Sequence, residues 1–224
     1  MPIKDFRQFI IILLFAGLVN LGFSASLPKT CASKCVRPFG SELGKNADVI
    51  AYSNCNTDCI SEQSSAAIKN VYSGMSWQCV EYARRWLIQV NQHTFGDVDN
   101  AQQIWDIEHV TGVGDSKKYK FISKPNPNRQ APEIGDLMIY KIALPDFPYG
   151  HVAVIVDVNS KAGYVDIAEQ NYTNNQWMDT NQYARRIILV HHHGKYQLID
   201  KDYANVADVS VNGVIIGWKH VSKK

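Results

Sequence analysis

The sequence predicts an α+β fold in which helices come first along the chain and one mostly antiparallel sheet follows. Between Gln78 and Gln92, apolar residues recur at three- and four-residue spacing, which is typical of an amphipathic helix. After residue 135 the chain consists of short β-branched runs separated by Gly, Pro, Asn and Asp, which is typical of strands. The 224 residues, with 46% hydrophobic and 20% charged content, suffice for one sizeable core.

The amino terminus has the pattern of a secretory signal peptide, which we place at residues 1–25. Lys4 and Arg7 precede an apolar run over 9–23, and small residues follow at 24–26. An uncleaved signal anchor is the alternative, but a bilayer span needs about 20 apolar residues and this run is shorter and interrupted. We therefore expect a secreted protein, with cleavage and no stable membrane insertion afterwards.

The cysteines all lie in the first 79 residues: Cys31, Cys35, Cys55, Cys59 and Cys79. The first four form two CxxxC pairs, which in an oxidising compartment predict two disulfides that tether residues 26–65, with the pairing left open. A zinc site built from the same four thiols is the alternative. The remaining thiol, Cys79, suggests chemical use, although a buried inert thiol is also common.

The helix over 78–92 follows a loop-rich stretch from 39 to 70 with one short strand at 49–52, and it places Cys79 in its first turn. A helix start offers partial positive charge and free amide hydrogens, which favour a reactive thiolate. Turn and capping chemistry is expected from the residues just before it: Ser73, Gly74 and Ser76. A solvated helix face is one explanation for three charged residues: Glu81, Arg84 and Arg85.

A second, shorter helix is predicted over 100–108. A loop punctuated by Gly and Lys and a proline-rich stretch over 125–132 then end the helical half. Five strands of one sheet are predicted after it: 135–141, 151–158, 163–168, 185–190 and 214–219. This order of elements favours α+β over a doubly wound architecture.

A cysteine nucleophile needs an imidazole to take and return the proton, and a polar group to hold that imidazole. His151 is the best-placed histidine, because it opens an apolar strand directly after a turn. On the expected next strand, Glu169 and Asn171 point to the same side because strand side chains alternate. Adjacent antiparallel strands then bring His151 beside Glu169 or Asn171. The sequence therefore predicts a cysteine hydrolase with Cys79 as nucleophile.

Several segments resemble the CHAP family of cysteine- and histidine-dependent amidohydrolases and peptidases: PFGSELG, GMSWQCVEYARRWL, GDLMIYK, YGHVAVIVDV, DIAEQN, QW and IIGW. They are similar in particular to the amidase domain of glutathionylspermidine synthetase/amidase and its trypanothione relatives. The resemblance covers residues 38–220 in order. It implies a papain-like (NlpC/P60-type) fold with amino-terminal helices packed on the sheet, and a catalytic domain over 66–224.

By this resemblance, Cys79 is the attacking thiolate, His151 the general base and acid, and Glu169 the group that orients the imidazole. Gln78 is implied to form the oxyanion hole with the Cys79 backbone amide, where donors face the developing charge. Arg84 and Asn171 match positions that line the substrate site. Trp77, next to the nucleophile, is also expected to line this cleft. No cofactor and no metal are implied.

The expected substrate is an amide in a peptide or a peptide-polyamine conjugate, such as a glutathionylspermidine-like, γ-glutamyl or glycyl amide. The signal peptide and the CxxxC pairs depart from the resembled amidases, so a peptidoglycan amidase or endopeptidase is the first alternative. An inactive secreted binding module is the second. The net charge of +2 offers no bulk electrostatic reason to expect nucleic acid, and nothing in the sequence indicates an oligomeric state.

Two further motifs have simpler explanations. His191, His192 and His193 precede Gly194 at a predicted hairpin turn, so we expect solvent-exposed histidines rather than metal ligands. Residues 171–173 form an N-glycosylation sequon that overlaps the expected substrate cleft. We therefore expect Asn171 to be unmodified.

Overall fold

The computed structural model describes residues 34–61, 63–65, 67–144, 147–203 and 213–222. Its helical elements are the α-helix α1 (Cys79–Trp86), the π-helical turn η2 (Leu87–Asn91) and the 3-10 helix η3 (Ala101–Asp106). The strands of the first half are β1 (Glu42–Asn46), β2 (Val49–Tyr52), β3 (His93–Thr94), β4 (His109–Gly112) and β5 (Lys118–Pro125). The strands of the second half are β6 (Leu137–Tyr140), β7 (His151–Asn159), β8 (Tyr164–Ala168), β9 (Arg185–His192), β10 (Lys195–Asp202) and β11 (Ile215–Val221).

Strands β3 to β11 form a nine-stranded antiparallel sheet in the order β10-β9-β8-β7-β6-β11-β5-β4-β3. The predicted antiparallel sheet is therefore confirmed, and all five strands predicted in its second half are present. Tyr140 pairs with His151, and Val154 pairs with Ala168. This register places the first residues of β7 and the last residues of β8 at the same end of their strands, close to the amino-terminal end of α1.

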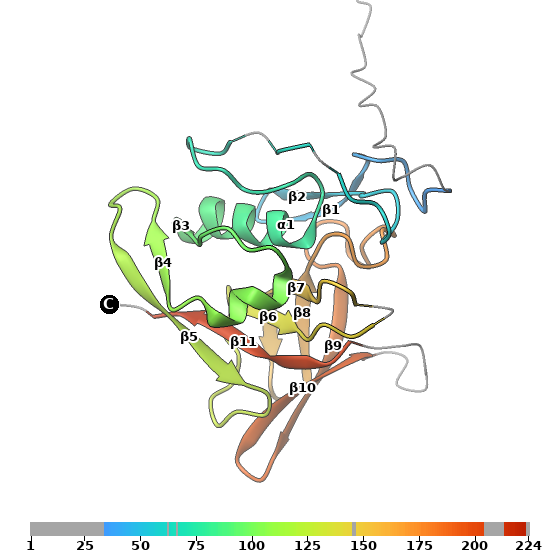
Figure 1. The fold of residues 1–224 in the computed structure, drawn as a ribbon. Helices are drawn as coiled ribbons and strands as arrows, with labels where there is room; N and C mark the ends of the chain where they lie inside the picture. The colour runs from blue at the N-terminus through green and yellow to red at the C-terminus, as the bar shows by residue number, and fades with distance from the viewer. Residues whose placement is uncertain (1–33, 62, 66, 145–146, 204–212, 223–224) are drawn as a thin grey trace, which may run out of the picture.

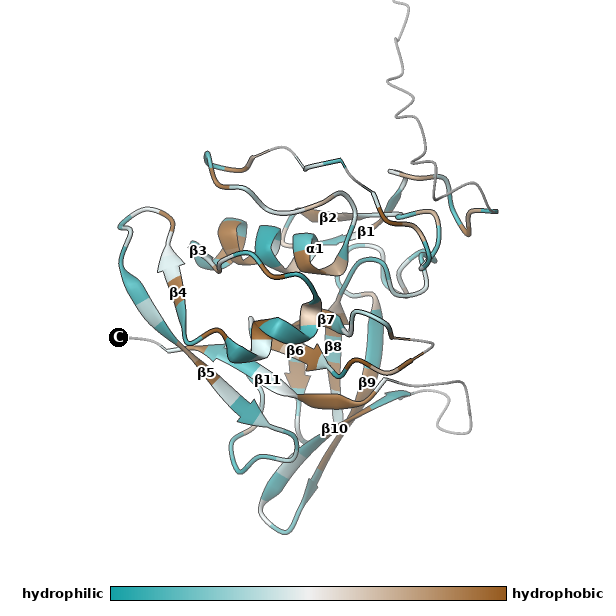
Figure 2. Cartoon of the chain, in the orientation of Figure 1, coloured by the Kyte–Doolittle hydropathy of each residue, from teal (hydrophilic) through white to brown (hydrophobic). Residues whose placement is uncertain are grey.

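The central strand β7 is buried on both faces, which explains its uninterrupted apolar run. Val152 and Val154 belong to the core on the side of α1, whereas Ala153 and Ile155 belong to the core on the opposite face. Figure 2 shows that hydrophobic residues gather on the central strands and on one side of α1. Strand β7, which begins with His151, is thus packed between the cores on the two faces of the sheet.

Helix α1 packs between the β1–β2 hairpin and the central sheet (Figure 1). The predicted helix over 78–92 is confirmed, although it changes to π-helical geometry after Trp86. A solvated charged face is wrong, because three charged side chains of α1 are buried: Glu81, Arg84 and Arg85. Arg85 lies 2.6 Å from Glu81, and Arg84 donates to two backbone carbonyls, so each buried charge has partners.

The expectation of several amino-terminal helices is not met by the described ranges, in which α1 is the single α-helix. The segment predicted as a helix over 100–108 forms the 3-10 helix η3, whose N-cap Asn100 accepts a bond from the Gln103 amide. The predicted loop before residue 125 is the β4–β5 hairpin, and the strands β1, β3 and β10 are also absent from the prediction. These strands lie in hairpins or at a sheet edge, where Lys, Ser and Asp weaken the hydrophobic alternation.

A disulfide joins Cys35 to Cys55, whose Cα atoms are 4.3 Å apart, and Cys59 is also disulfide-bonded. The four-thiolate zinc alternative is therefore wrong, since zinc binds thiolates and not disulfide sulfurs. Cys31 and the predicted signal peptide lie outside the described residues. Among the described residues, no helix is long and apolar enough to cross a membrane. The three histidines over 191–193 are exposed at the β9–β10 turn.

Candidate active site

Cys79 is the first residue of α1 and the one free cysteine of the described residues. A helix start leaves backbone amides without intrahelical partners and places the positive end of the helix dipole beside the sulfur. The expected N-terminal capping by Ser73, Gly74 or Ser76 is wrong, because the N-cap is Gln78 and no side chain caps the helix. The Ser73 hydroxyl instead bonds the buried Glu81 at 3.2 Å, which ties the preceding loop to α1.

His151 and Glu169 form a buried pair that interacts with Cys79. Nε2 of His151 lies 2.8 Å from Oε2 of Glu169, and the side chains are only 3% and 4% exposed. Because Nε2 faces Glu169, Nδ1 is the ring nitrogen left to face Cys79, whose interaction with the imidazole raises the pKa of His151. The imidazole also packs against Tyr140 and Tyr172, with ring centres 5.3 and 5.1 Å away. Of the two predicted partners, the structure brings Glu169 to the histidine.

The charges of the site keep His151 protonated and Glu169 ionised. Burial lowers the pKa of His151, but Cys79 and Glu169 outweigh burial and raise this pKa to about 9. Burial raises the pKa of Glu169, yet Arg185 and His151 hold it below its ordinary value. At neutral pH the pair is therefore an imidazolium and a carboxylate.

Gln78, directly before Cys79, belongs to a cluster of hydrogen-bonded side-chain amides. Its Nε2 donates to Oδ1 of Asn54 at 3.3 Å and to the Cys59 carbonyl at 3.2 Å. Its Oε1 accepts a bond from Nδ2 of Asn171 at 2.9 Å. Asn171 has a φ of 57°, a left-handed backbone that asparagine tolerates. These contacts hold the Gln78 side-chain amide in place directly before Cys79.

Arg84 and Trp77 occupy different environments. Nη1 of Arg84 donates to the Ser73 carbonyl at 2.8 Å, and Nη2 donates to the Gly96 carbonyl at 2.9 Å, at the wall of a cavity beside Cys79. Trp77 instead packs on Tyr52, with ring centres 4.2 Å apart. The expectation that Trp77 lines the cleft is therefore corrected, because the residue faces the β1–β2 hairpin.

Two cavities flank Cys79, and both are also lined by Gln78. The larger has a volume of about 480 Å³ and includes Arg84, Asp97 and Asp99 in its wall. Its rim carries four exposed apolar side chains: Ile60, Tyr72, Met75 and Tyr149. The second has a volume of about 350 Å³, and its wall includes His151, Asn171 and Tyr172. Cys79 and Gln78 thus form a wall that the two cavities share.

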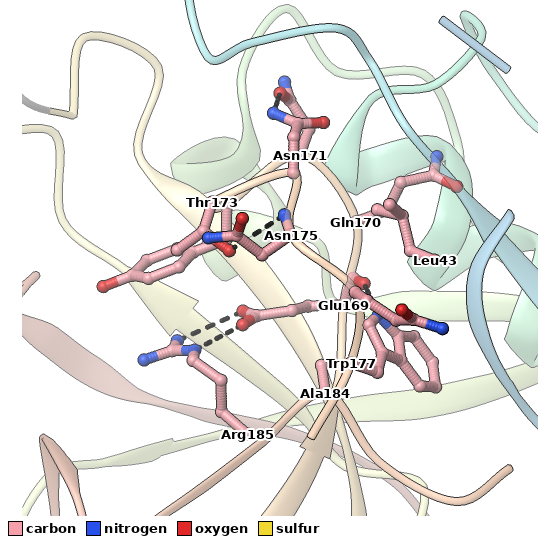
Figure 3. A pocket seen from close by; sticks show the side chains of 12 residues that line it. Leu43, Glu169, Gln170, Asn171, Thr173, Asn175, Trp177, Ala184 and Arg185 are labelled. Atoms are coloured by element: carbon pink, nitrogen blue, oxygen red, sulfur yellow. Dashed lines mark hydrogen bonds and ion pairs between the residues drawn. The ribbon is translucent and has the colours of Figure 1, made fainter. Parts of the chain in front are cut away.

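Sequence reasoning missed the residues behind Glu169. Nε of Arg185 lies 2.5 Å from Oε1 of Glu169, and Nη2 lies 3.2 Å from Oε2, a two-bond contact seen in Figure 3. Nη1 of Arg185 donates to Oδ1 of Asp200 at 2.7 Å, and Oδ2 of Asp200 accepts the Tyr172 hydroxyl at 3.0 Å. Arg185 begins an ordinary apolar strand and Asp200 lies in the missed strand β10, so neither belonged to a recognisable motif. Tyr172 had one signal, its position next to Asn171.

Comparison with known proteins finds a described domain that matches the part of the chain containing this site. The CHAP domain matches residues 70–171 of the chain. The matched range contains the helix that carries Cys79, the strand that begins with His151, and Glu169. The resemblance predicted from the sequence motifs is confirmed.

Three curated relatives match beyond this range. Trypanothione synthetase of Crithidia fasciculata is 32% identical over 184 residues, which are 81% of this chain and 26% of the relative. Glutathionylspermidine synthase of the same organism is 30% identical over 132 residues, 58% of this chain and 18% of the relative. Bifunctional glutathionylspermidine synthetase/amidase of Escherichia coli (strain K12) is 29% identical over 188 residues, 81% of this chain and 29% of the relative. The chain thus spans less than a third of the length of these relatives.

Proposed function

The chain carries a CHAP domain, and from this premise we propose that it is a cysteine amidase or peptidase that cleaves an amide bond through Cys79. The observation that carries the proposal is the spatial arrangement of the Cys79, His151 and Glu169 side chains. A sulfur at a helix start, an imidazolium that interacts with it, and a buried carboxylate 2.8 Å from the imidazole are the parts that thiol-dependent acyl transfer requires.

In the proposed reaction, the Cys79 thiolate attacks the amide carbonyl and forms a tetrahedral intermediate. The Cys79 backbone amide and the Gln78 side chain stabilise the oxyanion. The intermediate collapses to a thioester as the His151 imidazolium gives its proton to the departing amine. Neutral His151 then takes a proton from water, which attacks the thioester, and the carboxylic acid and the thiolate are released.

We propose that the substrate is an amide within a peptide or a peptide-polyamine conjugate. One relative is named as a glutathionylspermidine synthetase/amidase, which supports this class. The larger cavity also supports it, because Asp99 is exposed in its wall and complements a cationic group. Arg84 and Asp97 lie 3.3 Å apart in the same wall and already balance each other's charge. Peptidoglycan is the other substrate class to be tested, since its stem peptides also contain amides next to charged groups.

The test is a mass-spectrometric product screen that compares the wild-type protein with Cys79→Ala. The substrates are glutathionylspermidine, other γ-glutamyl amides and muropeptides. We expect a free amine and a new carboxylate from the wild-type protein alone, with the Cys79→Ala protein retaining the wild-type circular dichroism spectrum. Turnover of muropeptides alone would replace the proposed substrate class, and equal turnover by both proteins would refute the role of Cys79.

A second measurement addresses an inactive binding module. Iodoacetamide alkylates thiolates, so an activated Cys79 reacts faster near neutral pH than a model thiol does. The His151→Gln protein serves as the matched control, because it keeps Cys79 and the helix start but lacks the imidazolium. Equal rates for wild type, His151→Gln and the model thiol would contradict an activated nucleophile.

We also propose that the protein is exported, as the amino-terminal sequence pattern predicts. The Cys35–Cys55 disulfide and the bonded Cys59 support an oxidising compartment. Fractionation of producing cells tests this point, together with amino-terminal sequencing of the recovered protein. Recovery from the cytosolic fraction with reduced cysteines would contradict it.

A further inference from the structure

The carboxylate of Glu169 has two cationic neighbours. His151 approaches Oε2 at 2.8 Å, and Arg185 approaches Oε1 at 2.5 Å and Oε2 at 3.2 Å. The Glu169 side chain is only 4% exposed, so water contributes little to its solvation. A buried carboxylate that loses a cationic partner tends to take up a proton, because burial disfavours its charged form. Arg185 therefore bears directly on whether Glu169 stays ionised.

Arg185 is itself held in place from three directions. Nη1 donates to Asp200 at 2.7 Å, Nη2 donates to the Tyr140 hydroxyl at 3.1 Å, and the guanidinium lies 3.8 Å from the centre of the Tyr172 ring. The planar guanidinium presents its N–H groups in a fixed fork, so these contacts define its orientation. A lysine ammonium at this position would keep the charge but lose the fork.

The contacts close into a ring of side chains. Asp200 is fully buried and accepts the Tyr172 hydroxyl at 3.0 Å, and the Tyr172 ring packs on His151 at 5.1 Å. Starting from His151, this closed series of contacting side chains runs through Glu169, Arg185, Asp200 and Tyr172 and returns to the imidazole. Charges alternate along its first four members. Arg185 and Asp200 do not themselves line the cavities that flank the sulfur, so a change at either residue acts through Glu169 and Tyr172.

We propose that Arg185, oriented by Asp200, is a positioning residue that keeps Glu169 ionised and aimed at Nε2 of His151. This inference rests on the proposed function, because it concerns the same imidazolium. Arg185 acts through Glu169 and makes no contact with the reacting atoms. Its removal leaves Glu169 with one cationic partner, so the carboxylate takes up a proton more readily and holds the imidazolium less strongly.

Titratable groups face the His151–Glu169 pair from each element packed against it. They are Cys79 from α1, Tyr140 from β6, Tyr172 from the segment after β8, Arg185 from β9 and Asp200 from β10. Burial raises the pKa of both tyrosines above the ordinary value, so neither hydroxyl ionises between pH 5 and 10. Changes of the pH profile in this range therefore do not come from either tyrosine.

The experiment compares Arg185→Met, Arg185→Lys and Asp200→Asn with Arg186→Met. Arg186 is a matched control because it is the next residue of β9, makes a two-bond contact with Asp166 at 2.7 and 2.8 Å, and lies 3.8 Å over the Tyr164 ring. Arg186 thus loses the same kinds of contact when changed, but it does not touch Glu169. The readouts are kcat and KM on the amide cleaved by the wild type, and the pH profile of kcat/KM.

We expect Arg185→Met to lower kcat by at least about tenfold with KM within about twofold, since Arg185 orients the catalytic groups and does not bind substrate. The alkaline limb, near pH 9 in the wild type, should move to lower pH by at least about one unit. Arg185→Lys should retain part of kcat, and Asp200→Asn should move the limb in the same direction by less. Arg186→Met should leave the limb unmoved.

An NMR titration of the His151 ring, assigned with His151→Gln, gives the same answer without substrate. A downward shift of the His151 midpoint in Arg185→Met and Asp200→Asn supports the proposal even if no amide is cleaved, and in that case the proposed function fails alone. An unmoved midpoint in folded Arg185→Met and Asp200→Asn proteins overturns it. Equal losses of kcat in Arg185→Met and Arg186→Met, with unmoved pH profiles, also overturn it.

Discussion

Removal of the Cys35–Cys55 disulfide should weaken both the fold and the site. We consider the double substitution Cys35→Ser with Cys55→Ser, which leaves no unpaired partner thiol. The two cysteines are 20 residues apart in sequence. The disulfide restricts the unfolded chain, and a loop of this length corresponds to about 3 kcal/mol of stability at 25 °C. For a domain of this size, each kcal/mol corresponds to about 2–4 °C, so Tm should fall by about 6–12 °C.

The effect on activity follows from the neighbour of Cys55. Asn54 is fully buried and bonds Gln78 at 3.3 Å, and the Cys59 carbonyl bonds the same Gln78 amide at 3.2 Å. Loosening this segment releases the proposed oxyanion donor but leaves the His151–Glu169 pair intact. We therefore expect kcat to fall at temperatures well below Tm, with the alkaline limb of kcat/KM unmoved.

The assay is calorimetric unfolding combined with steady-state kinetics on the amide that the wild type cleaves. Leu189→Ala is the control, because Leu189 lies in the core on the face away from α1 and its truncation costs a similar amount, about 2–5 kcal/mol. That variant should lower Tm without lowering kcat at 25 °C. An unchanged Tm in the cysteine double variant would refute the loop-entropy reasoning, and an unchanged kcat would refute the link to Gln78.

Three further outcomes are expected. The wild-type kcat/KM should fall on the alkaline side with a midpoint near pH 9, because the departing amine needs the proton of His151. Burial lowers the pKa of His151, but Cys79 and Glu169 raise it to about 9, so a midpoint near 6.5 in a rate profile would contradict this. Arg84→Met should raise KM in steady-state kinetics, and an unchanged KM would remove Arg84 from the substrate site. In urea denaturation, the same substitution should lower the free energy of unfolding by about 1–3 kcal/mol for each buried carbonyl left without its donor. Protein from a glycosylating host should carry no glycan on Asn171, because Nδ2 donates to Gln78 at 2.9 Å; a glycan found there by peptide mass spectrometry in active protein would contradict this geometry.

Local patterns predicted the elements that carry the proposed nucleophile and base. The apolar spacing after Gln78 indicated a helix with Cys79 in its first turn, and the run after residue 150 indicated a strand that opens with His151. Period-two alternation placed two candidates for the imidazole partner on one side of the next strand. These inferences succeed because helix and strand periodicities depend on neighbouring residues.

The burial of polar and aromatic side chains could not be predicted from such local patterns. Glu81 and Arg85 resemble a solvated helix face in sequence, yet they form a buried pair because the β1–β2 hairpin covers that side of α1. Trp77 resembles a residue of the cleft, yet it stacks on Tyr52 of the same hairpin. Charge and aromatic character are visible in a sequence, but burial depends on what packs from elsewhere in the chain.

The amino-acid order alone was enough to identify an unpaired cysteine at a helix start, a histidine at a strand start and a family of cysteine hydrolases. The packing of β8, β9 and β10 decided that Glu169 rather than Asn171 holds the imidazole, and that Arg185 and Asp200 stand behind it. Helix and strand periodicity relates residues a few positions apart in the chain, so it can be recognised in the sequence. The ionisation of a buried carboxylate depends on charges that approach through space, so it becomes visible only when the strands lie side by side.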